Sequence, residues 1–139
     1  MDRPRPRNLP ARPLVLLVEG HEDTRAMYAF ALYASGFDVV AAQDGPEACA
    51  RVTRIHPDLI VADLPAPQQS GWALLDVLKR DDRTRDIPVV VISGGGQPSL
   101  RDFSVDWETF AAVFPKPCLP DELAAGLHEV INRQRDTHA

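Results

Sequence analysis

Cysteine, basic charge and long apolar stretches are scarce in this chain, and each scarcity excludes a class of protein. The two cysteines, Cys49 and Cys118, belong to no CxxC pair or Cys/His cluster, so neither a disulfide scaffold nor a zinc site is indicated, which is compatible with a reducing cytoplasm. The formal net charge of -5 argues against direct nucleic-acid binding through a basic surface. No apolar run reaches the length of a membrane span, and the first residues are rich in arginine and proline. We therefore expect neither a membrane helix nor a secretory signal, and a cytoplasmic location.

The chain length of 139 residues matches one domain that is large enough to enclose a hydrophobic core. Over residues 1–13 arginine alternates with proline, which lacks the N–H that helices and sheets need, so we expect a disordered arm there. A basic arm that touches an anionic partner is the alternative interpretation. We expect the folded domain over residues 14–133 and a C-terminal tail over residues 134–139.

Short apolar runs alternate with segments of helical periodicity from Leu14 onward. The runs predict five strands, at residues 14–18, 37–42, 59–62, 87–92 and 111–114. Helical spacing predicts a helix after each strand, with Met27, Phe30 and Ala34 recurring in the first and Phe103, Trp107 and Phe110 sharing a face in the fourth. Five strands that alternate with five helices predict parallel βα units with right-handed crossovers.

Polar residues with chemical potential stand at four of the predicted strand ends. Glu19 follows the first strand, Asp63 the third and Ser93 the fourth, and Lys116 comes shortly after the fifth. The carboxyl ends of parallel strands share one edge of a sheet, where such folds bind their ligands. Taken singly, each residue is more typical of a cap or a turn. Together they predict a functional site.

The order of these residues resembles the bacterial response-regulator receiver family. The stretches that carry the resemblance span roughly residues 14–133 and read VLLVEGHEDTR, PDLIVADLPAPQQSGWALL, IPVVVISGGG and VFPKPCLPDEL. The resemblance implies an α/β fold: a single-domain, flavodoxin-like (βα)5 doubly wound parallel sheet with strand order 2-1-3-4-5. It also implies a phosphoprotein that acts in a two-component system or phosphorelay.

The same resemblance implies a role for each residue. Asp63 would accept a phosphoryl group from a histidine kinase or phosphotransfer protein, Lys116 would supply positive charge, and Ser93 would bond a phosphoryl oxygen. Mg²⁺ would be held by Glu19, Asp63 and the backbone carbonyl of Pro65. The Lys116–Pro117 bond is expected to be cis.

The resemblance further implies a signalling protein rather than an enzyme, with at most self-catalysed transfer to Asp63 and hydrolysis from it. Output would pass to a downstream protein target, and a homodimer would form through the face of the fourth helix, fifth strand and fifth helix. We expect no direct contact with nucleic acid and none with a membrane.

Three positions depart from the family pattern. Gly20 stands where a second acid is usual, which predicts weaker binding of Mg²⁺. Pro65 has no N–H to offer the phosphoryl group, and Val113 replaces an aromatic residue that normally moves on activation. Strand alternation should point its neighbour Phe114 to the opposite face.

These departures keep alternatives open. One is a pseudo-receiver, an interaction module with an incomplete acidic pocket that is not phosphorylated. Another is a small flavodoxin-like nucleotide-binding protein or enzyme, which is disfavoured because no GxxxxGK[ST] or GxGxxG pattern follows the first strand. Near the site, His21 is either a ligand or gate or a solvated loop residue, and Cys118 is either a reactive thiol or an apolar filler.

Overall fold

The computed structural model describes residues 9–64, 72–93 and 110–137. Its strands are β1 (Leu14–Glu19), β2 (Asp38–Ala42), β3 (Leu59–Leu64), β4 (Val89–Ser93) and β5 (Ala112–Pro115). Its helices are α1 (Glu22–Ala34), α2 (Gly45–Ile55), α3 (Trp72–Arg80) and α5 (Pro120–Thr137). The predicted strands are confirmed, with shifts of one or two residues at their ends.

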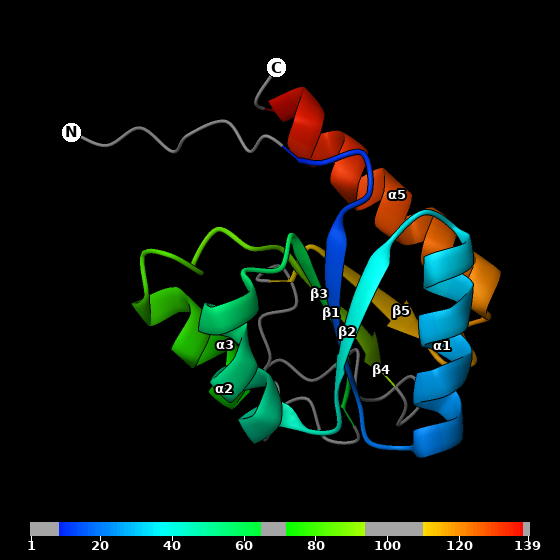
Figure 1. The fold of residues 1–139 in the computed structure, drawn as a ribbon, viewed down its shortest axis with the longest axis horizontal. Helices are drawn as coiled ribbons and strands as arrows, with labels where there is room; N and C mark the ends of the chain where they lie inside the picture. Colours follow the sequence, from blue (N-terminus) through cyan, green and yellow to red (C-terminus); the bar gives the residue numbers. More distant parts are fainter. Residues whose placement is uncertain (1–8, 65–71, 94–109, 138–139) are drawn as a thin grey trace.

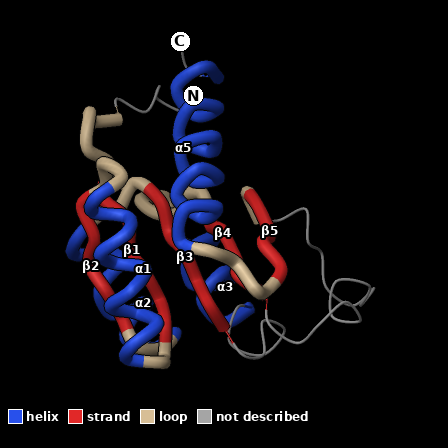
Figure 2. The backbone as a smooth tube through the Cα atoms, turned by 90° about the vertical axis from the view of Figure 1, so that its right-hand side faces the viewer, coloured by secondary structure: helices blue, strands red, loops and turns tan. Residues whose placement is uncertain are grey.

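The five strands form one parallel sheet in the order β2-β1-β3-β4-β5. Helices α1 and α5 cover one face of the sheet, and α2 and α3 cover the other (Figure 1). Figure 2 looks at the sheet from the side of α1 and α5, with β2 and β5 at its two edges. The order and the two helical layers confirm the flavodoxin-like fold class.

The core consists of two clusters because side chains alternate across the strands. In β1, Val15 and Leu17 pack toward α1 and α5, whereas Leu16 and Val18 pack toward α2 and α3. Each of these four residues is at most 1% exposed. Burial on both faces explains why the strands appear in the sequence as continuous apolar runs.

Helix α1 buries a different face from the one that apolar spacing suggested. Tyr28 and Leu32 are buried, whereas Met27 is 46% and Phe30 is 76% exposed. Apolar residues occur all round this helix, so spacing alone selected the wrong stripe. In α2 and α5, by contrast, apolar residues at helical spacing do face inward: Ala48 and Val52 are buried in α2, and in α5 the buried residues include Leu123, Leu127, Val130 and Ile131.

The predicted fourth helix lies largely outside the described residues, as do Phe103 and Trp107. Phe110 is described; it is 6% exposed and belongs to the core cluster on the α2/α3 face. Helix α5 continues to Thr137, beyond the Arg133 end that the sequence suggested. The bounds of the domain and of its terminal arm and tail stay a prediction. Within the described part of the chain, no helix has the length and apolar character needed to cross a membrane.

Candidate functional site

The register of the central strands brings two acidic side chains together. Glu19 at the end of β1 is the parallel partner of Asp63 in β3. Both have little contact with solvent, at 5% and 4% exposure. Buried carboxyl groups are costly unless they are paired or bind a cation, so this pair is unlike the acids on the surface of the chain.

Lys116 completes the site from the edge of the sheet. It follows β5 directly, and its backbone N–H donates to the Ser93 carbonyl at 3.0 Å. Its Nζ lies 2.8 Å from Asp63 Oδ1, and its side chain is 43% exposed. The Lys116–Pro117 peptide bond is cis, as expected. A lysine that is half in solvent therefore forms an ion pair with a buried carboxylate.

One oxygen of each acid remains without a hydrogen bond. Glu19 Oε1 accepts the His21 N–H at 2.9 Å, and Asp63 Oδ1 is paired with Lys116. Glu19 Oε2 and Asp63 Oδ2 are buried, and neither finds a hydrogen-bond donor among the described residues. Such oxygens need a cation or another donor to offset the cost of burial.

The surroundings of Glu19 favour its protonated form. Burial is the largest cause, followed by the neighbouring Asp63 carboxyl, which accepts a hydrogen bond only from protonated Glu19 and repels its ionised form; together they raise the pKa of Glu19 to about 7. The N–H of His21 and the charge of Lys116 act in the opposite direction, but they do not outweigh burial. Glu19 therefore gains and loses its proton close to neutral pH.

The structure brings three of the four predicted strand-end residues into one pocket. It is lined by Glu19, Gly20, His21, Asp63 and Lys116. Ser93 is described and is 4% exposed, but it is not one of the residues that line this pocket. Its backbone carbonyl accepts the Lys116 N–H. Its predicted role toward a phosphoryl group stays a prediction, and Pro65 lies outside the described residues.

The structure also shows the positions of four residues near the site that the sequence analysis discussed: His21, Cys118, Val113 and Phe114. The His21 side chain is the N-cap of α1 and accepts the Thr24 N–H. Burial raises the pKa of the Cys118 thiol, so it is better described as an apolar filler than as a reactive group. Val113 packs in the α2/α3 cluster and Phe114 in the α1/α5 cluster, which confirms their opposite orientation.

Two residues around the site were missed from the sequence. Arg25 Nη1 donates to the Glu19 carbonyl at 2.9 Å, and the Tyr28 hydroxyl donates to the Cys118 carbonyl at 2.7 Å. No local pattern identifies either contact, because both partners are backbone carbonyls. A buried tyrosine does need a partner for its hydroxyl, but the sequence does not say which.

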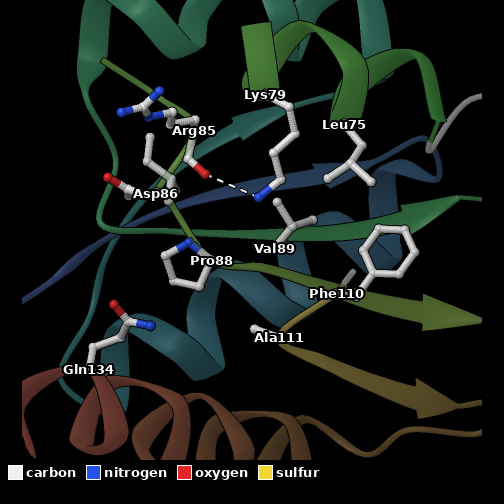
Figure 3. Close-up of a pocket in the computed structure, with 10 residues that line it drawn as sticks. Leu75, Lys79, Arg85, Asp86, Pro88, Val89, Phe110, Ala111 and Gln134 are labelled. Carbon is white, nitrogen blue, oxygen red and sulfur yellow. Dashed lines mark hydrogen bonds between the residues drawn. The ribbon is translucent and has the colours of Figure 1, made fainter. Parts of the chain in front are cut away.

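A second pocket lies at the other end of the sheet, where β4 and β5 begin (Figure 3). Leu75, Val89 and Phe110 supply apolar surface, and Lys79 Nζ donates to the Arg85 carbonyl at 3.1 Å. Asp86 is the one acid among the described residues that line it. The paired carboxylates therefore distinguish the Asp63 pocket as the candidate site.

The donor set of the Asp63 pocket fits a divalent cation such as Mg²⁺. Glu19 and Asp63 each present an unpaired, buried carboxylate oxygen, which is the ligand type that Mg²⁺ prefers. Among the described residues, no cluster of three or more His, Cys, Asp or Glu side chains is placed to hold a metal ion. Two carboxylates are in keeping with a cation that keeps several water ligands.

Comparison with known proteins identifies the class. A family model described as the response regulator receiver domain matches residues 15–128. The chain therefore belongs to the receiver domain family of two-component response regulators, whose members are signalling proteins. Membership of this family argues against the alternative that the chain is a flavodoxin-like nucleotide-binding protein or enzyme.

Particular relatives refine the comparison. The phosphate regulon transcriptional regulatory protein PhoB of Escherichia coli is 37% identical over 120 residues, which are 86% of this chain and 52% of that protein. The DNA-binding dual master transcriptional regulator RpaA of Synechocystis is 34% identical over 122 residues, 87% of this chain and 50% of that protein. The chain spans about half the length of these curated relatives.

Solved structures agree on the fold. The crystal structure of a sensor protein from Polaromonas has a TM-score of 0.77 and 28% identity, and the match covers 88% of this chain and 98% of that one. The chemotaxis response regulator CheY4 of Vibrio cholerae has a TM-score of 0.74 at 22% identity, covering 86% of this chain and 98% of that chain.

Proposed function

We propose that Asp63 is the phosphoryl acceptor of this receiver domain and that the donor is a histidine kinase or phosphotransfer protein. The observation that carries the proposal is the ion pair of 2.8 Å between Lys116 Nζ and Asp63 Oδ1. It leaves Asp63 Oδ2 without a donor among the described residues. Lys116 thus places a positive charge beside the carboxylate that would receive the phosphoryl group.

In the proposed step, a carboxylate oxygen of Asp63 attacks the phosphorus of a phosphohistidine. The new O–P bond makes an acyl phosphate, and the P–N bond breaks with its electron pair passing to the imidazole nitrogen. Lys116 offsets negative charge on the transferred group. The Ser93 hydroxyl is predicted to bond a phosphoryl oxygen.

Glu19 and Asp63 would hold Mg²⁺, together with the Pro65 carbonyl predicted from the sequence. When bound, the cation neutralises charge on the phosphoryl oxygens. Gly20 is exposed and offers no carboxylate, so the affinity for Mg²⁺ should be lower than with a second acid at this position. Where Glu19 is protonated near neutral pH, this proton must leave before the metal binds.

The proposed output is contact with a downstream protein target, with self-association through the face of β5, α5 and the predicted fourth helix. The named relatives are transcriptional regulators of about twice this length. The net charge of -5 argues against nucleic-acid contact by this chain itself. We expect these steps to take place in the cytoplasm.

The pseudo-receiver alternative rests on Gly20, Pro65 and Val113, and the described site does not support it. An abandoned pocket has no need of a lysine paired with a buried aspartate beside a second buried acid. These features accord better with a working phosphoryl site.

The test is phosphorylation by a small donor. The protein is incubated with acetyl phosphate and Mg²⁺ and analysed by intact mass and for an acid-stable, base-labile phosphoryl group. One phosphoryl group is expected in the wild type and in Asp76→Asn, which alters an exposed acid of α3, and none in Asp63→Asn. Absence of the group in the wild type at high Mg²⁺ contradicts the proposal.

A further inference from the structure

Tyr28 is the one described residue of α1 whose side-chain hydroxyl is tied to the loop after β5. The residue is 3% exposed, and its hydroxyl donates to the Cys118 carbonyl at 2.7 Å, across 90 positions of sequence. The phenyl ring of a phenylalanine would fill nearly the same space without the hydroxyl. The hydroxyl is therefore present for its hydrogen bond, because an unpaired buried hydroxyl is destabilising.

The loop that Tyr28 contacts is the one that carries Lys116. Cys118 comes two residues after Lys116, and the segment between them is held at three points. The Lys116 N–H donates to the Ser93 carbonyl at 3.0 Å, Lys116 Nζ pairs with Asp63, and the Cys118 carbonyl accepts from Tyr28. The first two contacts fix Lys116 on the sheet side, and the third fixes the loop from α1.

Helix α1 is itself anchored to the other acid of the pocket. Its cap residue His21 donates its N–H to Glu19 Oε1, and Arg25 donates to the Glu19 carbonyl, each at 2.9 Å. One helix thus contacts both the strand end that presents Glu19 and the loop that presents Lys116. A shift of α1 would therefore move both Glu19 and the loop that carries Lys116.

The Tyr28 hydroxyl keeps its proton over the whole physiological range. Burial, followed by the charges of Cys118, Asp63 and Glu19, raises its pKa to about 12. The hydroxyl is consequently a donor whenever the protein is folded near neutral pH.

We propose that Tyr28 is a positioning residue for phosphoryl transfer: its hydrogen bond to the Cys118 carbonyl holds the Lys116 ammonium against Asp63. This inference rests on the proposed function of Asp63. Tyr28 does not line the Asp63 pocket. It acts through the loop, by limiting the conformations that Lys116 samples.

The test compares Tyr28→Phe, which removes only the hydroxyl, with Tyr33→Phe. Tyr33 lies on the same helix and is 62% exposed, so the control makes the same chemical change away from the loop. The initial rate of acetyl phosphate-dependent phosphorylation is measured at saturating Mg²⁺. We expect about a three- to tenfold lower rate for Tyr28→Phe, the effect of one lost hydrogen bond, and a wild-type rate for Tyr33→Phe.

Two further measurements separate positioning from a general loss of stability. In a Lys116→Ala background, Tyr28→Phe should have no additional effect on the rate, because the residue through which it acts is gone. Amide hydrogen exchange should accelerate at the Lys116 N–H while the amides of β1 and β3 keep their wild-type rates.

The possible results are distinct. An unchanged rate in Tyr28→Phe, or a loss of equal size with and without Lys116, overturns the positioning role while the proposed function stands. Faster exchange throughout the sheet overturns it too, because the effect is then on global stability. If the wild type takes up no phosphoryl group, the proposed function fails, and local exchange at Lys116 still decides whether Tyr28 holds the loop.

Discussion

At the scale of single residues, Glu19 is a buried acid whose surroundings favour its protonated form. An acid with an ordinary pKa of 4.5 has its pKa raised to about 7 by burial and by the adjacent Asp63. Because the folded state holds this proton more tightly than the unfolded state, the folded protein loses stability as the pH rises from about 4.5 to about 7. The loss is on the order of 3 kcal/mol for one such group.

The first prediction concerns Glu19→Gln, which removes the buried charge and keeps the shape of the side chain. Without divalent cations, we expect the variant to melt several degrees higher than the wild type at pH 8 and close to it at pH 4.5. Thermal unfolding followed by circular dichroism at both pH values is the measurement. Glu22→Gln, on the exposed first turn of α1, is the control and should follow the wild type. A constant difference between variant and wild type across the range would contradict this account.

The second prediction restores the acid that the family pattern has at position 20. Gly20 is exposed, and a Cβ there would meet only the Gln43 carbonyl, at an ordinary 3.4 Å. Gly20→Asp should therefore fold normally and bind Mg²⁺ about tenfold more tightly, since it adds a negative oxygen ligand near Glu19 and Asp63. Isothermal titration calorimetry measures the affinity. Gly20→Asn has the same size without the charge, and an equal gain in that variant would rule out the electrostatic explanation.

At the scale of elements, the strands were the easiest feature to predict. The central strands β1, β3 and β4 are buried on both faces, and burial leaves a continuous apolar run in the sequence, as in Leu14–Val18. Their parallel arrangement then determines which residues meet, so the convergence of Glu19, Asp63 and Lys116 was predictable. The ion pair of Lys116 with one particular oxygen of Asp63, and the oxygens left unpaired, depend on side-chain positions that no spacing encodes.

Helix α1 was harder to predict, and the reason is physical. Its apolar residues surround the axis, so Met27 and Phe30 were as good a stripe as Tyr28 and Leu32. The choice between them is made by tertiary contacts. Tyr28 reaches Cys118, which is distant in the sequence. Tyr28, the residue that we propose as a positioning residue, is thus one that helical periodicity did not identify.

At the scale of the whole molecule, the segment just before β1 is attached to the fold. Arg12 pairs with Asp38 at 2.9 Å, donates to the carbonyls of Tyr33 and Phe37, and stacks on the Tyr33 ring at 4.1 Å. Arg135 of α5 donates to the Pro10 carbonyl at 2.9 Å. Leu9 packs against the α1/α5 cluster. Residues 9–13 therefore join both helices of one face.

The third prediction uses this attachment to test the expected domain boundary at residue 14. A chain that starts at Leu9 should unfold in urea like the full chain, because the segment it lacks is the Arg/Pro-rich part of the arm. A chain that starts at Leu14 should lose about 2 kcal/mol, the sum of the Arg12 contacts and the burial of Leu9. Arg12→Ala in the full chain should account for about half of that loss. If the two shortened chains are equally stable, residues 9–13 contribute nothing to stability, and the folded domain begins at residue 14 as the sequence predicts.

The pairing of Glu19 with Asp63 in the sheet also means that β3 does not tolerate a change in its number of residues before Asp63. One residue inserted or deleted inside β3 would turn Asp63 to the α2/α3 face, away from Glu19 and Lys116. Substitutions among the apolar residues of β3 would change only how its side chains pack. A one-residue shift in the register of the strand would instead remove the site. The number of residues from the start of β3 to Asp63 is therefore as much a part of the site as the acid itself.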